Sequence, residues 1–187
     1  MKKIILFGEV LIDSYKKYDL IGGAPLHIAL NLRKNSILPD IVSSVGKDKN
    51  GVKILNFCKN NGLSNKYINI NKDLKTGFAK ITQTKNENTF KIDKDSAWDM
   101  INKIPKFKPD LIYLGSIVGR SKHNIEKLKI IFRKPIKYIY FDLNLRKPHI
   151  NYSFIKFMIE KKVTHLKLTN NEYRYIRIKS GNSYKIK

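Results

Sequence analysis

Short apolar segments alternate with longer segments of helical periodicity along this chain, and no other feature restricts its fold as strongly. Apolar, strand-like runs occupy residues 3–8, 38–45, 111–115, 138–142 and 165–168, and helix-like segments occupy residues 24–34, 51–61, 121–134, 152–162 and 170–178. Strands that alternate with helices form βαβ units, whose strands run parallel. We therefore predict an α/β, Rossmann-like fold with a mostly parallel sheet flanked by helices.

One part of the chain departs from this alternation. Residues 76–84 and 89–92 alternate polar and apolar side chains with a period of two, which predicts a β-hairpin. Together with the segment near residues 12–21 they form the only candidate for a second unit, a small β lid made from about 12–21 and 76–93. The length of 187 residues otherwise suits a single domain with its own core.

The apolar spacing of the predicted helices indicates which side faces the core. In helix 51–61, Val52, Leu55 and Cys58 lie one above another, and the pair Asn61-Gly62 is a termination signal. We expect these three side chains to be buried against the sheet.

The formal net charge of +23 raises the question of nucleic-acid binding. Nucleic-acid surfaces favour arginine for its bidentate guanidinium, whereas this chain has 32 lysines and six arginines. Lys, Asn and Ile fill 77 of the 187 positions, and the codons of all three are rich in A and T, so base composition explains the charge more simply. A solvated basic surface is favoured, with a nucleic-acid-binding protein left as an alternative.

Other classes are excluded more directly. No apolar run approaches the roughly 18 residues of a membrane span, and the first strand is too short for the apolar part of a signal peptide. A single cysteine, Cys58, permits neither an intramolecular disulfide nor a cysteine zinc site, which favours the cytoplasm. His123, His149 and His165 show no metal-ligand spacing, so no direct metal ligands are predicted.

Polar and small residues follow several predicted strands at the point where each strand ends. They are Gly8 and Glu9 after the first strand, Gly115 and Ser116 after a later one, then Asp142, Asn144 and Arg146, and finally Lys167, Thr169 and Glu172. Turns are polar in any protein, and this explains any one strand alone. Because ligands of open α/β sheets bind at the carboxyl ends of the strands, four such strands together favour a shared site.

Several segments in order resemble the PfkB, or ribokinase-like, carbohydrate kinase family, and within it the fructokinase-like branch. They are FGEVLID, GGAPLHIALNL, VSSVGKDKNGVKIL, SAWDMI, YLGSIVGRS, YFDLNLRKP and LKLTNNE, which span residues from about 4 to 177. The resemblance implies a ribokinase-like fold. It also implies transfer of the ATP γ-phosphate to a sugar hydroxyl with Mg²⁺, a small-molecule sugar as substrate, and a homodimer formed through the lid.

The resemblance also implies roles for residues in the sugar pocket. Asp13 would accept hydrogen bonds from sugar hydroxyls, and Gly22 and Gly23 would let the sugar rest against the backbone. Asn144 and Arg146 would line the pocket between sugar and phosphate.

On the nucleotide side, Lys167 and Glu172 would lie toward the nucleotide and the metal ion. Without the resemblance, Glu172 is equally an ordinary first-turn acid of a helix.

Three departures from the family pattern stand out. His27 occupies a position where the sugar-site helix usually carries Asn, and Thr169 stands where the Glu172 block usually begins with Asn. The C-terminal block of the form D-T-x-G-A-G-D, which carries the catalytic Asp and the anion hole, is not found. We therefore expect an incomplete, C-terminally truncated kinase domain over residues 1–187, without a catalytic residue in this chain and inactive or weakly active. A non-catalytic sugar- or partner-binding remnant is the alternative.

Overall fold

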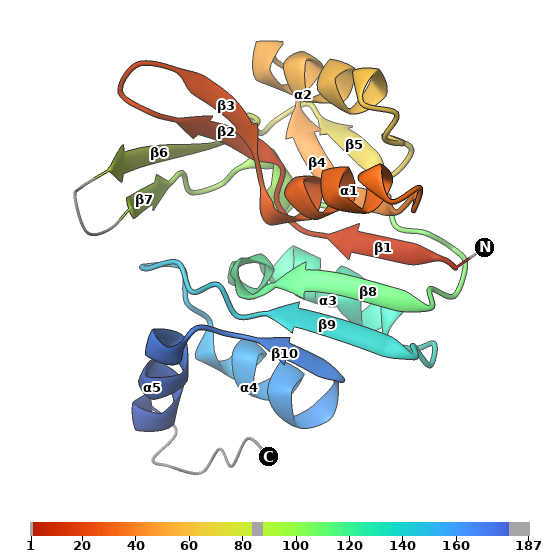
Figure 1. Ribbon diagram of the computed structural model, residues 1–187, viewed down its shortest axis with the longest axis vertical. Helices are drawn as coiled ribbons and strands as arrows, with labels where there is room; N and C mark the ends of the chain where they lie inside the picture. The colour runs from red at the N-terminus through yellow and green to blue at the C-terminus, as the bar shows by residue number, and fades with distance from the viewer. Residues whose placement is uncertain (1, 84–87, 180–187) are drawn as a thin grey trace.

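The computed structural model describes residues 2–83 and 88–179. Within this part, a parallel six-stranded sheet has the order β10-β9-β8-β1-β4-β5 (Figure 1). Its strands are β1 (Ile4–Phe7), β4 (Asp40–Gly46), β5 (Ile68–Asn71), β8 (Leu111–Gly115), β9 (Tyr138–Asp142) and β10 (His165–Lys167). Every pairing in it is parallel, which confirms the predicted ribokinase-like α/β class.

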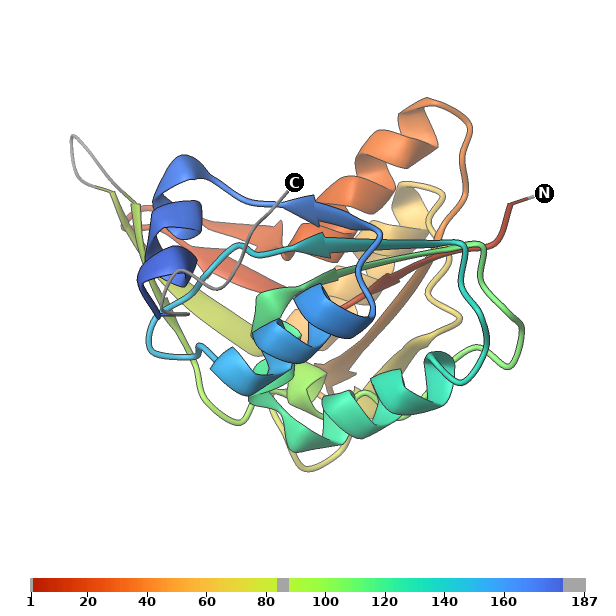
Figure 2. The same cartoon turned by 90° about the horizontal axis from the view of Figure 1, so that it is seen from below.

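Helices cover both faces of this sheet (Figure 2). Helices α1 (Ala24–Lys34) and α2 (Lys49–Asn60) pack on one face, and α3 (Lys122–Ile131) and α4 (Tyr152–Lys161) pack on the other, while α5 (Asn170–Lys179) follows β10. Strand β1 shows how the sequence divides the two cores, because Leu6 joins the α1–α2 cluster whereas Ile5 and Phe7 join the α3–α4 cluster. Successive strand side chains point to opposite faces, and in a parallel sheet both are buried.

A second, four-stranded sheet forms the lid, in the order β3-β2-β6-β7. Its strands are β2 (Leu11–Ser14), β3 (Asp19–Gly22), β6 (Gly77–Gln83) and β7 (Asn88–Ile92). The antiparallel pairs β2–β3 and β6–β7 meet in a parallel β2–β6 pairing, and the lid projects to one side of the main sheet (Figure 1). The predicted hairpin and the two lid segments are therefore confirmed.

One local prediction was wrong in part. Cys58 is buried as predicted, but Val52 is 57% exposed and Ile54 is buried in its place. With 3.6 residues per turn, Val52 lies about 120° around the helix from Cys58, outside the buried face. The helix predicted over residues 121–134 is confirmed as α3 (Lys122–Ile131), which ends earlier than expected and is preceded by a 3-10 helix, η2 (Ser116–Arg120). Strand β5 and a second 3-10 helix, η1 (Ala97–Asp99), were not predicted.

No helix in the part of the chain that the structure describes is long and apolar enough to cross a membrane.

Candidate sugar-binding site

Two lid strands bring the first candidate residues into contact. Asp13 lies on β2 and Gly22 ends β3, its antiparallel neighbour. A Cβ atom on Gly22 would lie only 2.0 Å from Oδ2 of Asp13. The Asp13 carboxylate therefore occupies the space that a side chain at Gly22 would need. The missing side chain therefore lets Asp13 lie against the backbone that leads into α1.

Gly23 makes the sharp entry into α1. Its φ of +110° is a conformation that favours glycine, and a Cβ atom there would lie 2.3 Å from the backbone oxygen of Glu9. The Gly23 carbonyl accepts hydrogen bonds from the amides of Leu26 and His27 at 3.1 and 3.2 Å. Pro25 lies in the first turn of α1, the part of a helix that tolerates proline best.

Glu9 lies beneath this helix end; it is one of the polar residues expected at the strand ends, although the family resemblance assigned it no role. Its side chain is buried, and Oε1 accepts a hydrogen bond from the Ala24 amide at 3.1 Å. Oε2 has no partner among the described residues. Burial raises the pKa of Glu9, opposed by backbone hydrogen bonds and by Arg146. Its position directly after a buried strand is the sequence signal that placed it among the candidates.

Arg146 connects the loop after β9 with the lid. Its guanidinium carbon lies 4.1 Å from the centre of the Phe90 ring on β7. Burial raises the pKa of Asp13, and the charges of His27 and Arg146 oppose that shift. His27 and Arg146 thus both lie within electrostatic reach of Asp13, although the three residues come from separate elements.

The loop after β9 holds Asn144 and Leu145 at the carboxyl end of the sheet. Asn144 has a φ of +32°, and its half-buried side chain makes no hydrogen bond to another described residue. The Leu145 amide donates a 2.7 Å hydrogen bond to Oε1 of Glu172. A cavity of about 460 Å³ opens beside this loop, lined in part by Phe90, Arg146 and Glu172. Asn144 and Asp13 are not among the residues that line it, so the cavity by itself does not join the candidate sugar-binding residues.

Thr169 and Glu172 form a reciprocal cap at the start of α5. Oε2 of Glu172 accepts hydrogen bonds from the Thr169 amide at 2.8 Å and hydroxyl at 3.0 Å, and the Glu172 amide donates to that hydroxyl at 3.3 Å. This is the capping-box arrangement, in which two helix-end donors are satisfied at once. Glu172 thus connects α5 to the loop after β9, and Thr169 is the residue type that this cap prefers.

Replacing Thr169 with alanine is expected to lower the free energy of unfolding by about 1 kcal/mol, because the hydroxyl of the cap is lost. Thr169→Ser, which keeps the hydroxyl, should stay close to the wild type. Urea unfolding followed by circular dichroism measures both changes. Equal stability of the alanine and serine variants would show that the cap contributes nothing.

Lys167 is paired within the protein. Its Nζ lies 2.7 Å from Oδ2 of Asp142, which also accepts a 3.1 Å hydrogen bond from the Tyr113 hydroxyl. The hydrogen bond to Asp142 raises the pKa of Lys167, so the amine carries its positive charge at neutral pH. Lys167 is mostly exposed, and its side chain therefore presents a cation at the end of β10.

Replacing Glu9 with glutamine is expected to flatten the pH dependence of stability. Because burial raises the pKa of Glu9 above its ordinary value of 4.5, its contribution to stability is greatest below that pH. That contribution is lost as the pH rises through the folded-state pKa. Glutamine stays neutral and can still accept the Ala24 hydrogen bond. The unfolding free energies of variant and wild type should agree near pH 4 and diverge in favour of the variant toward about pH 8. A difference that stays constant with pH contradicts this prediction.

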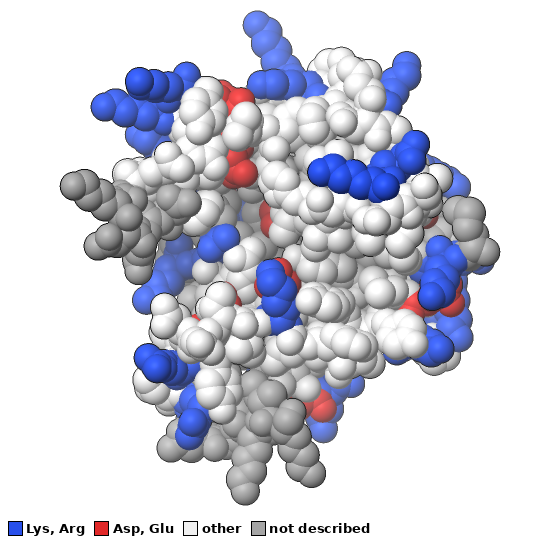
Figure 3. Space-filling model, viewed as in Figure 1, with Lys and Arg blue, Asp and Glu red and all other residues white. Residues whose placement is uncertain are grey.

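Charge on the surface is dispersed. On the face shown in Figure 3, Lys and Arg side chains are scattered, most of them near the rim and some within the face, and acidic side chains lie in part of the hollow between the lid and the main sheet. The described residues form no continuous basic stripe across this face.

Comparison with known proteins identifies the family. The family model described as pfkB family carbohydrate kinase matches residues 1–183. The chain belongs to the pfkB family. Within this family it is 26% identical over 129 residues to a probable chloroplastic fructokinase-6 of Arabidopsis thaliana, which confirms the predicted fructokinase-like resemblance. It is 36% identical over 141 residues to an ATP-dependent 6-phosphofructokinase of Thermoanaerobacterium thermosaccharolyticum.

A solved structure is also similar in fold. The Vibrio cholerae O395 fructokinase in its fructose, ADP and calcium ion bound form superimposes with a TM-score of 0.81 at 17% identity, over 94% of this chain and 63% of that chain. The two sequence matches cover 61% and 68% of this chain. They span 33% of the Arabidopsis protein and 38% of the Thermoanaerobacterium protein, so the chain matches about a third of the length of each.

Proposed function

We propose that this chain forms the sugar-binding part of a fructokinase-like carbohydrate kinase and binds a free ketohexose such as fructose. The observation that carries the proposal is the position of the Asp13 carboxylate. It lies over Gly22, at the entry to α1, within electrostatic reach of His27 and Arg146. A polyol needs several converging acceptors and donors on a surface that it can approach closely.

In this proposal each group has a separate task. The Asp13 carboxylate accepts hydrogen bonds from two sugar hydroxyls, and the bare backbone at Gly22 and Gly23 lets the ring lie flat. Asn144 and Arg146 donate to oxygens on the opposite side. The lid covers the sugar and keeps water away from the reacting hydroxyl.

The phosphoryl donor is proposed to be ATP, because the Thermoanaerobacterium relative is an ATP-dependent 6-phosphofructokinase and the Vibrio fructokinase structure contains ADP. Lys167 and the end of β10 are the proposed nucleotide side, where a cation stabilises phosphate charge.

The described residues do not fit a Mg²⁺ site built from several protein ligands. No group of three or more His, Cys, Asp or Glu side chains among them could hold a metal ion. The oxygens of Glu172 already accept three hydrogen bonds. We derive no step through a protein-held metal ion.

We also propose a homodimer through the lid and a cytoplasmic location. Tyr18 and Leu20 on the lid are 54% and 50% exposed, which gives the lid apolar surface to bury. The one cysteine, Cys58, is free and buried, as suits a reducing compartment.

Isothermal titration with fructose tests the proposed function. The wild type should bind fructose, and Asp13→Asn should weaken binding about 10- to 100-fold, because a charged acceptor is lost. Asp19→Asn changes the same charge at an exposed lid position and should bind like the wild type.

Two results would contradict the proposal. One is equal fructose affinity in the Asp13 and Asp19 variants. The other is no heat with fructose together with duplex DNA binding that weakens steeply with salt, which would favour a nucleic-acid-binding protein.

A further inference from the structure

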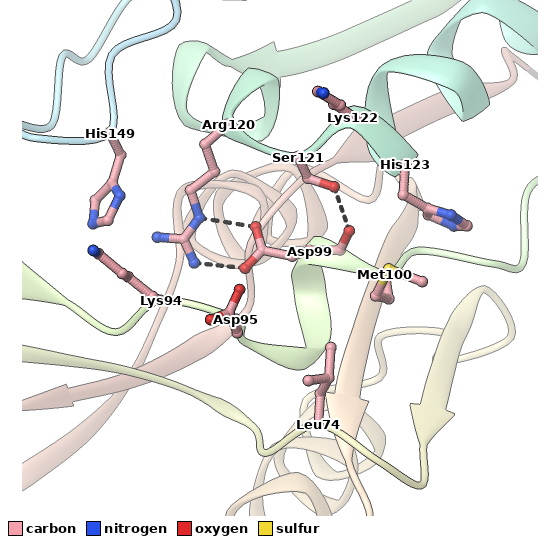
Figure 4. A pocket seen from close by; sticks show the side chains of 10 residues that line it. All are labelled: Leu74, Lys94, Asp95, Asp99, Met100, Arg120, Ser121, Lys122, His123 and His149. Atoms are coloured by element: carbon pink, nitrogen blue, oxygen red, sulfur yellow. Dashed lines mark hydrogen bonds and ion pairs between the residues drawn. The ribbon is translucent and has the colours of Figure 1, made fainter.

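A second cavity lies apart from the candidate sugar site. It has a volume of about 530 Å³, within the usual range for small-molecule pockets. Its walls come from the segment that follows lid strand β7, from η1, from the start of α3 and from the loop after β9 (Figure 4). None of Asp13, Gly22, Gly23 and Arg146 is among the residues that line it.

Arg120 is fixed in the wall of this cavity. Its Nε and Nη2 atoms donate to the two carboxylate oxygens of Asp99 at 2.8 and 2.7 Å, and Nη2 also donates to the Asp93 carbonyl at 2.8 Å. The guanidinium carbon lies 4.0 Å from the centre of the Trp98 ring. With 9% of its side chain exposed, Arg120 is held in one orientation by contacts on three sides.

The remaining nitrogen of Arg120 has no partner. Nη1 is buried and makes no hydrogen bond to any described residue. In Figure 4 this nitrogen faces His149 and Lys94, on the side of the guanidinium away from Asp99. A buried charged donor without an acceptor is costly, so a ligand that offers an oxygen atom here would be stabilised.

The other charges around the cavity favour an anion. Lys94 and Lys122 are exposed cations on its rim, and Arg120 already neutralises Asp99, which leaves Asp95 as the one unpaired acid among the lining residues. His123 and His149 each place Nε2 3.1 Å from a backbone carbonyl. Burial and the nearby charge of Arg120 lower the pKa of His149, so this ring adds no charge at neutral pH.

The start of α3 adds donors to the same wall. The amides of Lys122 and His123 lie in the first turn of a ten-residue helix, where backbone N–H groups have no acceptor within the helix. The helix dipole also favours negative charge at this end. Ser121 caps the helix by accepting from the Asn124 amide, which leaves the earlier amides available.

We propose that this cavity binds a small phosphate-bearing anion, at a site separate from the sugar pocket. The phosphate oxygens would accept from Arg120 Nη1 and from the first-turn amides of α3, with Lys94 and Lys122 supplying charge. The same chemistry would recognise inorganic phosphate or a phosphate ester.

Amide chemical-shift titrations of the whole chain test this proposal, with inorganic phosphate in one series and fructose 6-phosphate in another. Saturable shifts at residues 94–95 and 122–123 are expected in at least one series. Shifts from phosphate alone indicate a free-anion site, and shifts from the ester alone indicate a sugar phosphate. The double variant Lys94→Gln with Lys122→Gln should weaken this binding about tenfold.

The matched control is Lys53→Gln with Lys59→Gln, which removes the same charge from exposed positions on α2. Its phosphate affinity should equal that of the wild type. Equal weakening in both double variants would show general attraction to a basic protein and would overturn the proposal. No saturable shift around the cavity at millimolar ligand, or shifts confined to the Gly22–Gly23 turn, would overturn it as well.

Discussion

Replacing Gly23 with alanine should lower the free energy of unfolding by about 2–4 kcal/mol. Two independent costs add at this position. The φ of +110° is a conformation that side chains rarely adopt, and the new Cβ atom would lie 2.3 Å from the Glu9 backbone oxygen and 3.0 Å from the Val10 Cα. Both neighbours are backbone atoms next to buried β1, so they cannot move aside without displacing the strand.

Urea unfolding measures this change, and Gly115→Ala is its control. At Gly115 the nearest atom to an added Cβ would be the Asp142 carbonyl oxygen at 3.8 Å, an ordinary contact. We expect the control to stay within about 0.5 kcal/mol of the wild type. A Gly23 variant as stable as the control would show that the entry into α1 does not require glycine.

The neighbouring substitution, Gly22→Ala, should spare the fold and remove sugar binding. Its added Cβ would lie 2.0 Å from Oδ2 and 2.5 Å from Cγ of Asp13, and these atoms are the far end of a flexible side chain. The carboxylate can rotate away, so the unfolding free energy should fall by less than about 1 kcal/mol. The displaced carboxylate can no longer meet the sugar, and fructose affinity should fall about 10- to 100-fold.

Titration calorimetry and urea unfolding on the same samples separate the two effects. The contrast between adjacent glycines is the informative result, since Gly23→Ala acts on stability and Gly22→Ala acts on binding. If Gly22→Ala binds fructose as the wild type does, the Asp13 carboxylate is not part of a sugar site.

Much of the fold could be predicted because its strands are buried on both faces. Segments such as Ile4–Phe7 and Leu111–Gly115 are continuous runs without a charged residue, as expected of strands covered on both faces. Strand β5 escaped prediction because its sequence, Ile-Asn-Ile-Asn, is short and half polar. Val52 was expected in the core because residues three apart lie on nearly the same side of a helix, but steps of three fall short of the 3.6-residue turn and bring Val52 about 120° around the helix from Cys58.

The candidate site was predicted less completely, because several of its contacts join residues that are far apart in the sequence. The contact between Asp13 and Gly22 lies within one hairpin and could be anticipated. Glu172 was assigned to the nucleotide side, although the Thr-x-x-Glu spacing is itself a local capping signal. Its bond to the Leu145 amide joins residues 27 positions apart, which a local pattern does not reveal.

The cavity around Arg120 had no sequence signal of its own. Asp99 and Arg120 are 21 positions apart and meet only because η1 and η2 lie next to each other in the folded chain. Each residue alone resembles an ordinary surface charge in the sequence.

A fructose titration that is monitored through the amide chemical shifts of the chain locates the sugar directly. If one pocket joins the lid, the α1 entry and the loop after β9, the amides of Asp13, Gly22, Gly23 and Leu145 should shift together with a single dissociation constant. Shifts that saturate at only one of these places, or that map to another part of the molecule, would show that these groups do not share a ligand.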